Sequence, residues 1–491
     1  AGHQLEIDNV LNFDQVRKVL ESKEPLAAFP GIAVTHVNIG QDSLGEERWS
    51  LSPYSTIFVI IDSSGKKLKR GEFGRFLKGI DTGLDEVFEG KFRGKFPDEW
   101  LRVRVPNSHI HKFGWQPSET QILYIRHSDN WDSLTLSVQQ YLNHHKAQLE
   151  GRLVYQHPSS HYEWWQLHRP RLSLFSPKIF FPRRSSSNRF AVDEAGDIGF
   201  KSDVAALLKD PHDAHDIYYL CALLNSKVLE FRYRAMGGLG KLTGQGMFEY
   251  FENQVGDLPI PMFDDPEHNP DHRRLSELGK EAHQLFKERY QVVEAYQLKS
   301  QTVNYQMVPF WLYHDPAGEY RELIQWASPA PNREGHLLDL RIEPTKIGYV
   351  LWGEITEDEN WREGEREWVS LAKVSIDYAP LRRFLLARAV YLTDFDETFR
   401  RRQKYTGETG NSVRAGFLAL TTPCYDDDRM RNLKIIENVE SRVISEAGRA
   451  DLDRILLRQK AVEQEIDDIA YRLYGVEPYR DLITAALQLS L

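Results

Sequence analysis

The stretch from Trp164 to Pro261 decides the fold assignment, because it carries four short motifs in order. They are Trp164-Trp165-Gln166-Leu167-His168-Arg169-Pro170-Arg171, Ser176-Pro177-Lys178-Ile179-Phe180-Phe181-Pro182-Arg183, Leu223-Leu224-Asn225-Ser226-Lys227 and Leu258-Pro259-Ile260-Pro261. From Tyr162 to Arg189 the only acid is Glu163, whereas the basic residues are Arg169, Arg171, Lys178, Arg183, Arg184 and Arg189. Such a local excess of positive charge is typical of a surface that binds phosphates.

Three further motifs lie outside this stretch. They are Gly79-Ile80-Asp81-Thr82-Gly83-Leu84-Asp85-Glu86-Val87-Phe88, Ser108-His109-Ile110-His111-Lys112-Phe113-Gly114 and Glu465-Ile466-Asp467-Asp468-Ile469-Ala470-Tyr471-Arg472-Leu473-Tyr474-Gly475. In this order and spacing, the motifs resemble the target-recognition region of type IIG and BREX-like restriction-modification adenine-N6 DNA methyltransferases, the TaqI-like C-terminal specificity domain. Asp85 departs from the family pattern, in which Asn is usual. The resemblance implies recognition of duplex DNA.

The composition indicates a soluble protein of a reducing compartment. The chain has 491 residues, 41% of them hydrophobic and 27% charged, which suggests about two to four domains. Cys221 and Cys424 lie too far apart for a disulfide framework or a metal-binding pair. We see no signal peptide and no apolar run of membrane-spanning length, so we expect a cytoplasmic prokaryotic protein that contacts no membrane.

The charge distribution favours DNA binding on one face only. The net charge of -10 argues against nonspecific affinity over the whole surface. Basic residues outnumber acidic ones from Lys66 to Lys112, however, and the acidic surplus lies elsewhere, notably from Glu354 to Glu367. DNA binding depends on local charge, so a basic face on an acidic body remains compatible with it.

The pattern of apolar residues predicts a mixed α/β fold. Strand-like runs occur at 121–126, 178–181 and 189–192, and helical patterns at 137–152 and 217–232. The run Ile57-Phe58-Val59-Ile60-Ile61 fits either a buried strand or one face of a helix, and the resembling enzymes favour the helix. Residues 1–45, with a short helical pattern at 13–20 and a strand-like run at 32–37, are expected to be a remnant or linker from an upstream domain.

Two helical segments show heptad spacing. They are Leu275, Leu278, Ala282, Leu285, Arg289, Val292 and Tyr296, and Ile455, Gln459, Val462, Ile466, Ile469 and Leu473. One interpretation pairs residues 271–300 and 433–479 as an antiparallel, coiled-coil-like spacer that carries residues 301–432 as a small β-rich insertion. The alternative is two amphipathic helices that pack on separate cores. Residues 46–262 would form the DNA target-recognition domain.

Catalytic motifs are not found in this sequence. The family's adenine methyltransferases use an Asn-Pro-Pro-Tyr/Phe loop and a Gly-rich S-adenosylmethionine loop, whereas Asn269-Pro270 is followed here by Asp271. The Gly-rich run Gly237-Gly238-Leu239-Gly240-Lys241 fits neither a cofactor loop nor a P-loop. No nuclease or zinc motif has the required spacing. We therefore expect no catalytic residues, metal or cofactor in this chain, and place S-adenosylmethionine in a separate methyltransferase domain.

The resemblance and the local chemistry together suggest a set of DNA-binding residues. Arginine can bind guanine and asparagine can bind adenine, so the loop 183–189 is the first candidate. The Gly-rich loop 237–246 is the second, although a plain flexible loop explains it nearly as well. The full set is Lys78, Thr82, Arg169, Arg171, Arg183, Arg184, Ser186, Asn188, Arg189, Lys241, Thr243 and Gln245. The segment Asn225-Ser226-Lys227 is interpreted as mainly structural.

Two functions remain open from the sequence. The first is a sequence-specific duplex-DNA recognition module, the specificity half of a restriction-modification or phage-defence adenine-N6 methyltransferase. Its partners would be DNA, the methyltransferase domain or subunit, and a nuclease or other defence subunit. The second is an assembly subunit of such a system, without DNA specificity, that docks protein partners through the heptad helices and the 301–432 insertion. A nuclease with an unrecognised site is a weaker third.

Overall fold

A computed structural model describes most of the chain. The described residues are 2–7, 32–37, 54–70, 73–157, 160–171, 176–235, 239–242, 247–298, 306–309, 324–325, 336–356, 367–376, 378–396, 399, 416–417, 419–424 and 429–488. The helical pattern expected at 13–20 lies outside these residues. The strand expected at 32–37 is β2 (Ile32–Val37), which pairs antiparallel with β1 (Gly2–Ile7).

A four-stranded antiparallel sheet forms the centre of the recognition region. Its strand order is β12 (Ala191–Asp193), β10 (Lys178–Pro182), β14 (Val204–Lys209) and β4 (Gly74–Lys78). Alternate residues of a strand point to opposite faces. Ile179 and Phe181 therefore enter one hydrophobic core, whereas Phe180 enters another. The sheet thus separates two cores and contributes to both, which explains why β10 is buried along its whole length.

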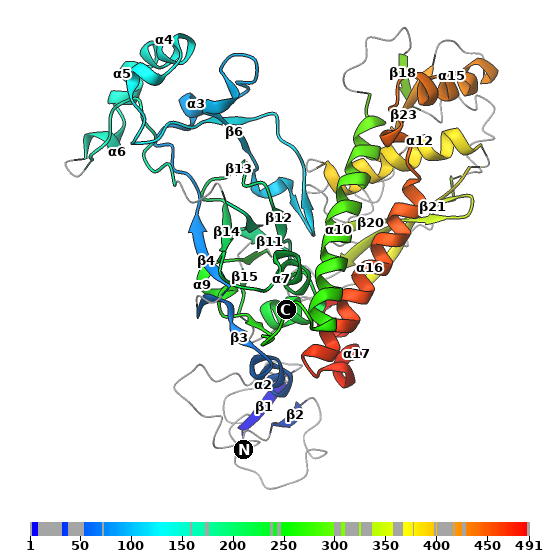
Figure 1. Cartoon of the computed structure of the whole chain (residues 1–491). Coiled ribbons are helices and arrows are strands. Elements are labelled where there is room, and N and C mark those ends of the chain that lie inside the picture. The colour runs from blue at the N-terminus through cyan, green and yellow to red at the C-terminus, as the bar shows by residue number, and fades with distance from the viewer. Residues whose placement is uncertain are drawn as a thin grey trace.

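One core lies between the sheet and a smaller lobe, which the chain forms mainly between β4 and β10. A second sheet has the order β13 (Ile198–Gly199), β6 (Leu101–Arg104), β9 (Gln121–Leu123) and β5 (Glu89–Gly90). Around it lie α3 (Asp85–Phe88), α4 (Leu136–His144), α5 (Lys146–Glu150) and α6 (Leu153–Gln156). Figure 1 shows this lobe beyond the end of β4, so that β4 runs toward it.

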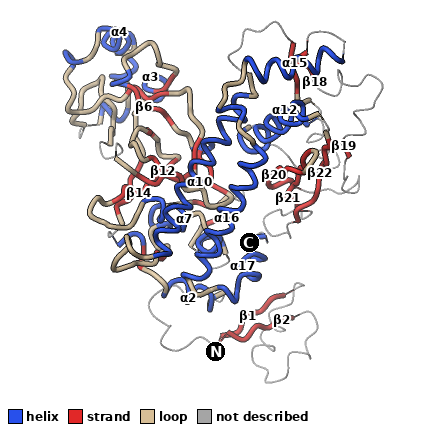
Figure 2. Tube along the Cα trace, turned by 45° about the vertical axis from the view of Figure 1, so that its right-hand side comes forward, coloured by secondary structure: helices blue, strands red, loops and turns tan. Residues whose placement is uncertain are grey.

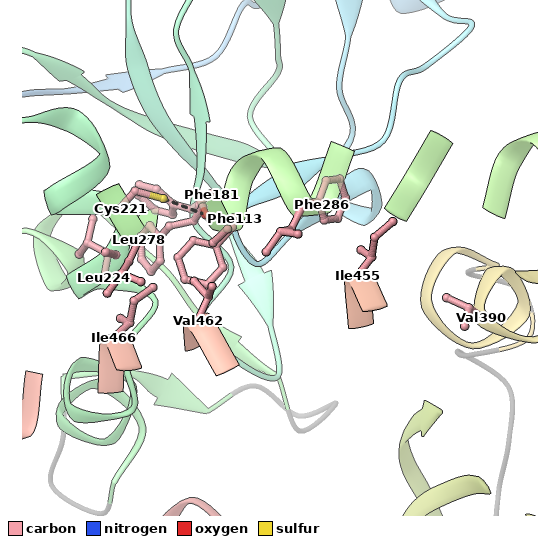
Figure 3. Close-up of a cluster of buried hydrophobic side chains, with 14 of the residues drawn as sticks. Phe113, Phe181, Cys221, Leu224, Leu278, Phe286, Val390, Ile455, Val462 and Ile466 are labelled. Atoms are coloured by element: carbon pink, nitrogen blue, oxygen red, sulfur yellow. Dashed lines mark hydrogen bonds between the residues drawn. The ribbon is translucent and has the colours of Figure 1, made fainter. Parts of the chain in front are cut away.

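The other core joins the sheet to helices from the N-terminal, middle and C-terminal parts of the chain. It contains α2 (Ser55–Ser63), α7 (Ile217–Leu224), α8 (Lys227–Arg234), α10 (Pro270–Ala295) and α16 (Leu452–Leu473). In Figure 3, Phe181 of the sheet and Leu224 of α7 lie close to Leu278 of α10 and Ile466 of α16. Residues 55–63 are thus helical, as the family resemblance favoured.

The two heptad helices pack against each other in antiparallel orientation (Figure 2). Three ion pairs join them in opposite chain directions: Asp271 with Arg472, Arg274 with Glu465, and Glu281 with Arg458. The Nε–Oε1 distances of the second and third pairs are 2.7 and 2.6 Å. Helix α10 begins at Pro270 after the N-cap Asn269, whose side chain accepts a hydrogen bond from the His272 N–H. The antiparallel pairing of the two heptad seams is therefore observed for α10 and α16. Residues 433–442 of the second predicted segment instead belong to a separate helix, Arg429–Arg442.

The chain between the paired helices contains the expected β-rich part. Three long strands, β20 (His336–Thr345), β21 (Gly348–Thr356) and β22 (Glu367–Ser375), form an antiparallel sheet with β19 (Ile324–Gln325) at its edge. Two helices, α12 (Ala379–Val390) and α15 (Arg429–Arg442), and the strand pair β18 (Gln306–Pro309) and β23 (Thr421–Cys424) complete it. The mixed α/β class is confirmed. In the described part, no helix combines the length and apolar character that crossing a bilayer requires.

Two predicted helices are interrupted. The pattern at 137–152 is divided into α4 and α5 at His145, whose backbone angles are not helical, and α5 ends at Glu150. The extended Arg152 then separates α5 from α6. The pattern at 217–232 breaks at Asn225 and Ser226, both fully buried. The Asn225 side chain donates to the carbonyls of Phe190 and Cys221, and Ser226 caps α8. This confirms the structural interpretation of that segment.

Candidate nucleic-acid interface

Several predicted DNA-binding residues gather at one end of the central sheet. Lys78 is the last residue of β4 and pairs with Ala205 of β14, while Pro182 of β10 pairs with Val204. Arg183 follows directly, and its backbone N–H donates to the Asp203 carbonyl over 3.0 Å. Because these strands are antiparallel, Lys78 and Arg183 leave the sheet at the same end. We refer to it as the Lys78 end.

A tight turn fixes the chain beyond Lys78. A Cβ atom on Gly79 would lie 2.2 Å from the carbonyl oxygen of Lys201, so only glycine fits there without a shift. Two residues later, Asp81 and Arg169 exchange backbone hydrogen bonds of 3.1 and 2.8 Å. This bridge holds Arg169 beside the turn, and Arg171 follows with a left-handed φ of 52°. The side chains of Lys78, Arg169 and Arg171 are exposed.

The loop that begins at Arg183 forms a short sheet of its own. Its strand order is β11 (Arg184–Ser185), β16 (Phe248–Glu249) and β15 (Lys241–Leu242). Glu249 is in register with both Arg184 and Lys241. The two loops proposed from the sequence, 183–189 and 237–246, are therefore neighbours through β16. The sequence offers no signal for this pairing, because the two loops are more than 50 residues apart.

The two arginines of this loop differ in how firmly acidic residues hold them. Arg183 forms an ion pair with Glu252 of α9 (Glu252–Val255), and its side chain is only 22% exposed. The side chain of Arg184 is 59% exposed and lies 3.6 Å from a Glu249 carboxylate oxygen. An exposed ion pair contributes about 0–1 kcal/mol, so Arg184 can leave Glu249 for a phosphate or a base at little cost.

Asn107 and Asp203 complete the support of Arg184, and the sequence did not indicate them. Asn107 Nδ2 donates to the Arg184 carbonyl over 3.1 Å. Asp203 accepts hydrogen bonds from the Asn107 N–H over 2.9 Å and from Arg104 Nη2 over 2.8 Å. The smaller lobe thus fixes the backbone of the loop while the Arg184 side chain remains exposed.

Lys201 joins this region to the acidic start of α3. Its ammonium group pairs with Asp85, and with Glu89 at 2.6 Å. Burial opposes the charge of Lys201, but the hydrogen bonds to Asp85 and Glu89 raise its pKa above the ordinary value. Lys201 is therefore neutralised within the fold. In contrast, Lys78, Arg169 and Arg171 have no acidic partner among the residues that the structure describes.

Two residues of the predicted set have their side chains engaged inside the fold. Asn188 is 1% exposed, donates to the Leu224 carbonyl over 2.7 Å and accepts from the Tyr250 hydroxyl over 2.9 Å. Thr82 is also 1% exposed and donates to Asp85. These contacts fill the hydrogen-bonding capacity that a base or phosphate would need. The DNA contacts predicted for Asn188 and Thr82 are therefore not retained.

The other predicted residues are half-buried, or are described by their backbone alone, or lie outside the described residues. Ser186 and Arg189 are half-buried in the loop after β11. Lys241 lies in β15 by its backbone register. Thr243 and Gln245 lie outside the described residues. The cations with a described exposed side chain at the Lys78 end are thus Lys78, Arg169, Arg171 and Arg184.

Comparison with known protein families finds a match within this region of the fold. Residues 126–260 match the model of the TaqI-like C-terminal specificity domain. The fold and this match together define a mixed α/β protein with this specificity domain.

Among solved structures, the chain is similar to the type IIG restriction endonuclease BpuSI, with 13% sequence identity and a TM-score of 0.32. The similarity covers 46% of this chain and 28% of that protein. No curated protein matches the chain.

Proposed function

We propose that this chain is the sequence-specific duplex-DNA recognition part of an adenine-N6 methyltransferase of a restriction-modification or phage-defence system. The observation that carries the proposal is the group of exposed cations at the Lys78 end, which lies within or beside the matched specificity domain. Recognition is assigned to residues 46–262, with 271–300 and 433–479 as a spacer and 301–432 as an insertion.

The cations at the Lys78 end suit the two tasks of DNA recognition. Contacts to phosphate supply affinity and register, and contacts to base edges supply sequence choice. Arg169 is held by a backbone bridge beside a tight turn, which suits a fixed phosphate contact. Arg184 projects from a short sheet whose backbone is pinned by Asn107, which suits a base contact in the major groove.

The acidic residues behind these cations favour specific over general binding. Glu249 and Glu252 partly neutralise Arg184 and Arg183. Together with the net charge of -10, they weaken attraction to arbitrary DNA. A duplex whose bases offer hydrogen-bonding groups at the right places can take over Arg184 from Glu249. Duplexes of other sequences cannot.

Catalysis is assigned to a domain or subunit outside this chain. That domain would bind S-adenosylmethionine and transfer its methyl group, and the present chain would present the recognised site to it. A nuclease or other defence subunit is a further partner of the proposed complex, which we place in the prokaryotic cytoplasm.

The alternative of an assembly subunit docks protein partners through the heptad helices and the 301–432 insertion. Leu275, Leu278 and Ala282 of α10 and Val462 and Ile466 of α16 are instead buried in one core. The seam is therefore used within the chain, which removes the main support for docking a partner through it.

Selection from a random-duplex library tests the proposed function. At about 150 mM salt, where charges beyond roughly 8 Å are screened, the full chain should enrich one motif of several base pairs. Binding to that motif should fall with salt at a log–log slope of about -4, as expected for four or five phosphate contacts. Enrichment of no motif, or affinity that does not change with salt, would contradict the proposal.

A further inference from the structure

One exposed apolar side chain stands out near the Lys78 end. Leu153, the first residue of α6, is 85% exposed, the largest value among the large hydrophobic residues of the described chain. Its neighbours Val154 and Tyr155 are half-buried, and Gln156 is polar. Among the described residues of α6, Leu153 is therefore the only exposed apolar side chain.

The backbone that carries Leu153 is held firmly. The preceding residue, Arg152, is 4% exposed, and its guanidinium group donates to four backbone carbonyls. The acceptors are those of Leu149, Thr82, Gln166 and Trp164, at 2.6–3.1 Å. The guanidinium also lies over the rings of Phe88, Tyr155 and Tyr162. An exposed leucine on so rigid a support is preorganised for contact.

The same contacts place α6 beside the cations. The Arg152 bond to the Thr82 carbonyl ties α6 to the turn that follows Lys78. A Cβ on Gly83 would lie 2.9 Å from Val154 Cγ2 and 3.2 Å from His168 Cβ, so both residues border this glycine. Arg169 follows His168 directly. The contacts of Arg152 and Val154, the two neighbours of Leu153, therefore place this exposed leucine near the segment in which Arg169 is bridged to Asp81.

We propose that Leu153 is a wedge that inserts between two adjacent base pairs of the bound duplex. Leucine is among the side chains that proteins insert into a base step, where they unstack and kink the DNA. Arg169, the cation that follows His168 in the segment beside α6, can contact a phosphate that flanks such a step. A protein partner would need a broad apolar area, which α6 does not offer. The inference rests on the proposed function, and unstacked DNA is the state from which a base is extruded for chemistry.

Fluorescence of 2-aminopurine tests the wedge, because its emission rises when the base unstacks. The probe is placed in turn at each position of a duplex that carries the selected motif, and the full chain is added. We expect emission to rise about threefold at one or two adjacent positions. Leu153→Ala should remove most of this rise and weaken binding on the order of tenfold, whereas Leu153→Met should keep both.

Leu136→Ala is the matched control. Leu136 is 68% exposed and begins α4 of the same lobe, but the contacts described above do not tie α4 to the Thr82 turn. Neither leucine is part of the core, so both variants should fold. Unchanged emission and affinity in Leu153→Ala would overturn the proposal while leaving the proposed function intact. If Leu153→Ala left the DNA readouts unchanged but abolished self-association in sedimentation velocity, Leu153 would be a protein contact. Failure of the wild-type chain to bind any duplex would remove both ideas together.

Discussion

Substitution of Arg184 with alanine is expected to weaken binding to the selected motif by about 10- to 100-fold, the loss of one bidentate contact to a base. The side chain is 59% exposed, and its ion pair with Glu249 is long, at 3.6 Å, so the folded state should lose little stability. The effect on binding should be large because Asn107 holds the Arg184 backbone, which leaves the guanidinium preorganised. Titration of the labelled motif and of a scrambled duplex measures both affinities.

The way in which affinity is lost distinguishes a base contact from a phosphate contact. If Arg184 reads a base, Arg184→Ala should relax the preference at one position of the motif. If it contacts a phosphate, binding should weaken about equally for all sequences, and the salt slope should fall by about 1. Charge reversal of both Arg183 and Arg184 should abolish site-specific binding. Because Arg183→Glu also places a carboxylate beside Glu252, the single Arg184 variant is the cleaner test.

Arg472→Ala provides the control for Arg184. The side chain of Arg472 is 53% exposed and forms an ion pair with Asp271 between the paired helices, away from the central sheet. Its removal changes the net charge equally, so a general electrostatic effect would appear in both variants. If the two substitutions weakened DNA binding equally, or if Arg184→Ala did not weaken it, Arg184 would have no specific role in recognition.

Removal of the Asp193 carboxylate is expected to lower the free energy of unfolding by about 3–5 kcal/mol, the cost of leaving a buried charge without its partner. Lys178 in β10 is 0% exposed, and its ammonium group bonds to Asp193 in β12. Burial lowers the pKa of Lys178, and the Asp193 charge opposes that shift. Asp193 also accepts hydrogen bonds from the N–H groups of Gly196 and Ile198, at 2.9 and 3.1 Å. Asp193→Ala therefore disrupts the ion pair and the turn after β12 together.

Urea unfolding followed by tryptophan fluorescence measures this loss. Asp197→Ala, an exposed acid of the same turn, should change stability by less than about 0.5 kcal/mol. The double variant Lys178→Met, Asp193→Ala should recover part of the loss, because replacing both charged partners leaves no buried charge. Equal stability of Asp193→Ala and Asp197→Ala would show that the buried pair is not needed.

Much of the fold could be predicted from local patterns. Ile179, Phe180 and Phe181 are apolar and β-branched or aromatic, and they form the centre of the buried strand β10. The heptad spacing indicated one apolar stripe on each of α10 and α16. The structure distinguishes the two interpretations left open by the sequence, because the two stripes pack against each other. These features depend on residues that are near neighbours in sequence.

The errors came from contacts between distant residues. The helix predicted at 137–152 is interrupted at His145 and ends at Glu150. Arg152 then donates to the Thr82 and Trp164 carbonyls, contacts that local periodicity cannot reveal. Asn188 has the chemistry of an adenine-reading residue, but the end of α7 and Tyr250 enclose it. The placement of Arg184 and Lys241 on the two sides of Glu249 depends on β16, and the roles of Asn107 and Asp203 depend on how the smaller lobe meets the sheet.

The two cores on opposite faces of the central sheet set a practical limit on dissecting this protein. A fragment cut to the 126–260 family match would lack β4 at one edge of the sheet and the strands β5, β6 and β9 of the smaller lobe. It would also lose α10 and α16, which form part of the core that contains Ile179 and Phe181. An expression fragment that keeps both faces closed starts before α2 and retains the paired helices, so the unit of homology is smaller than the unit of folding.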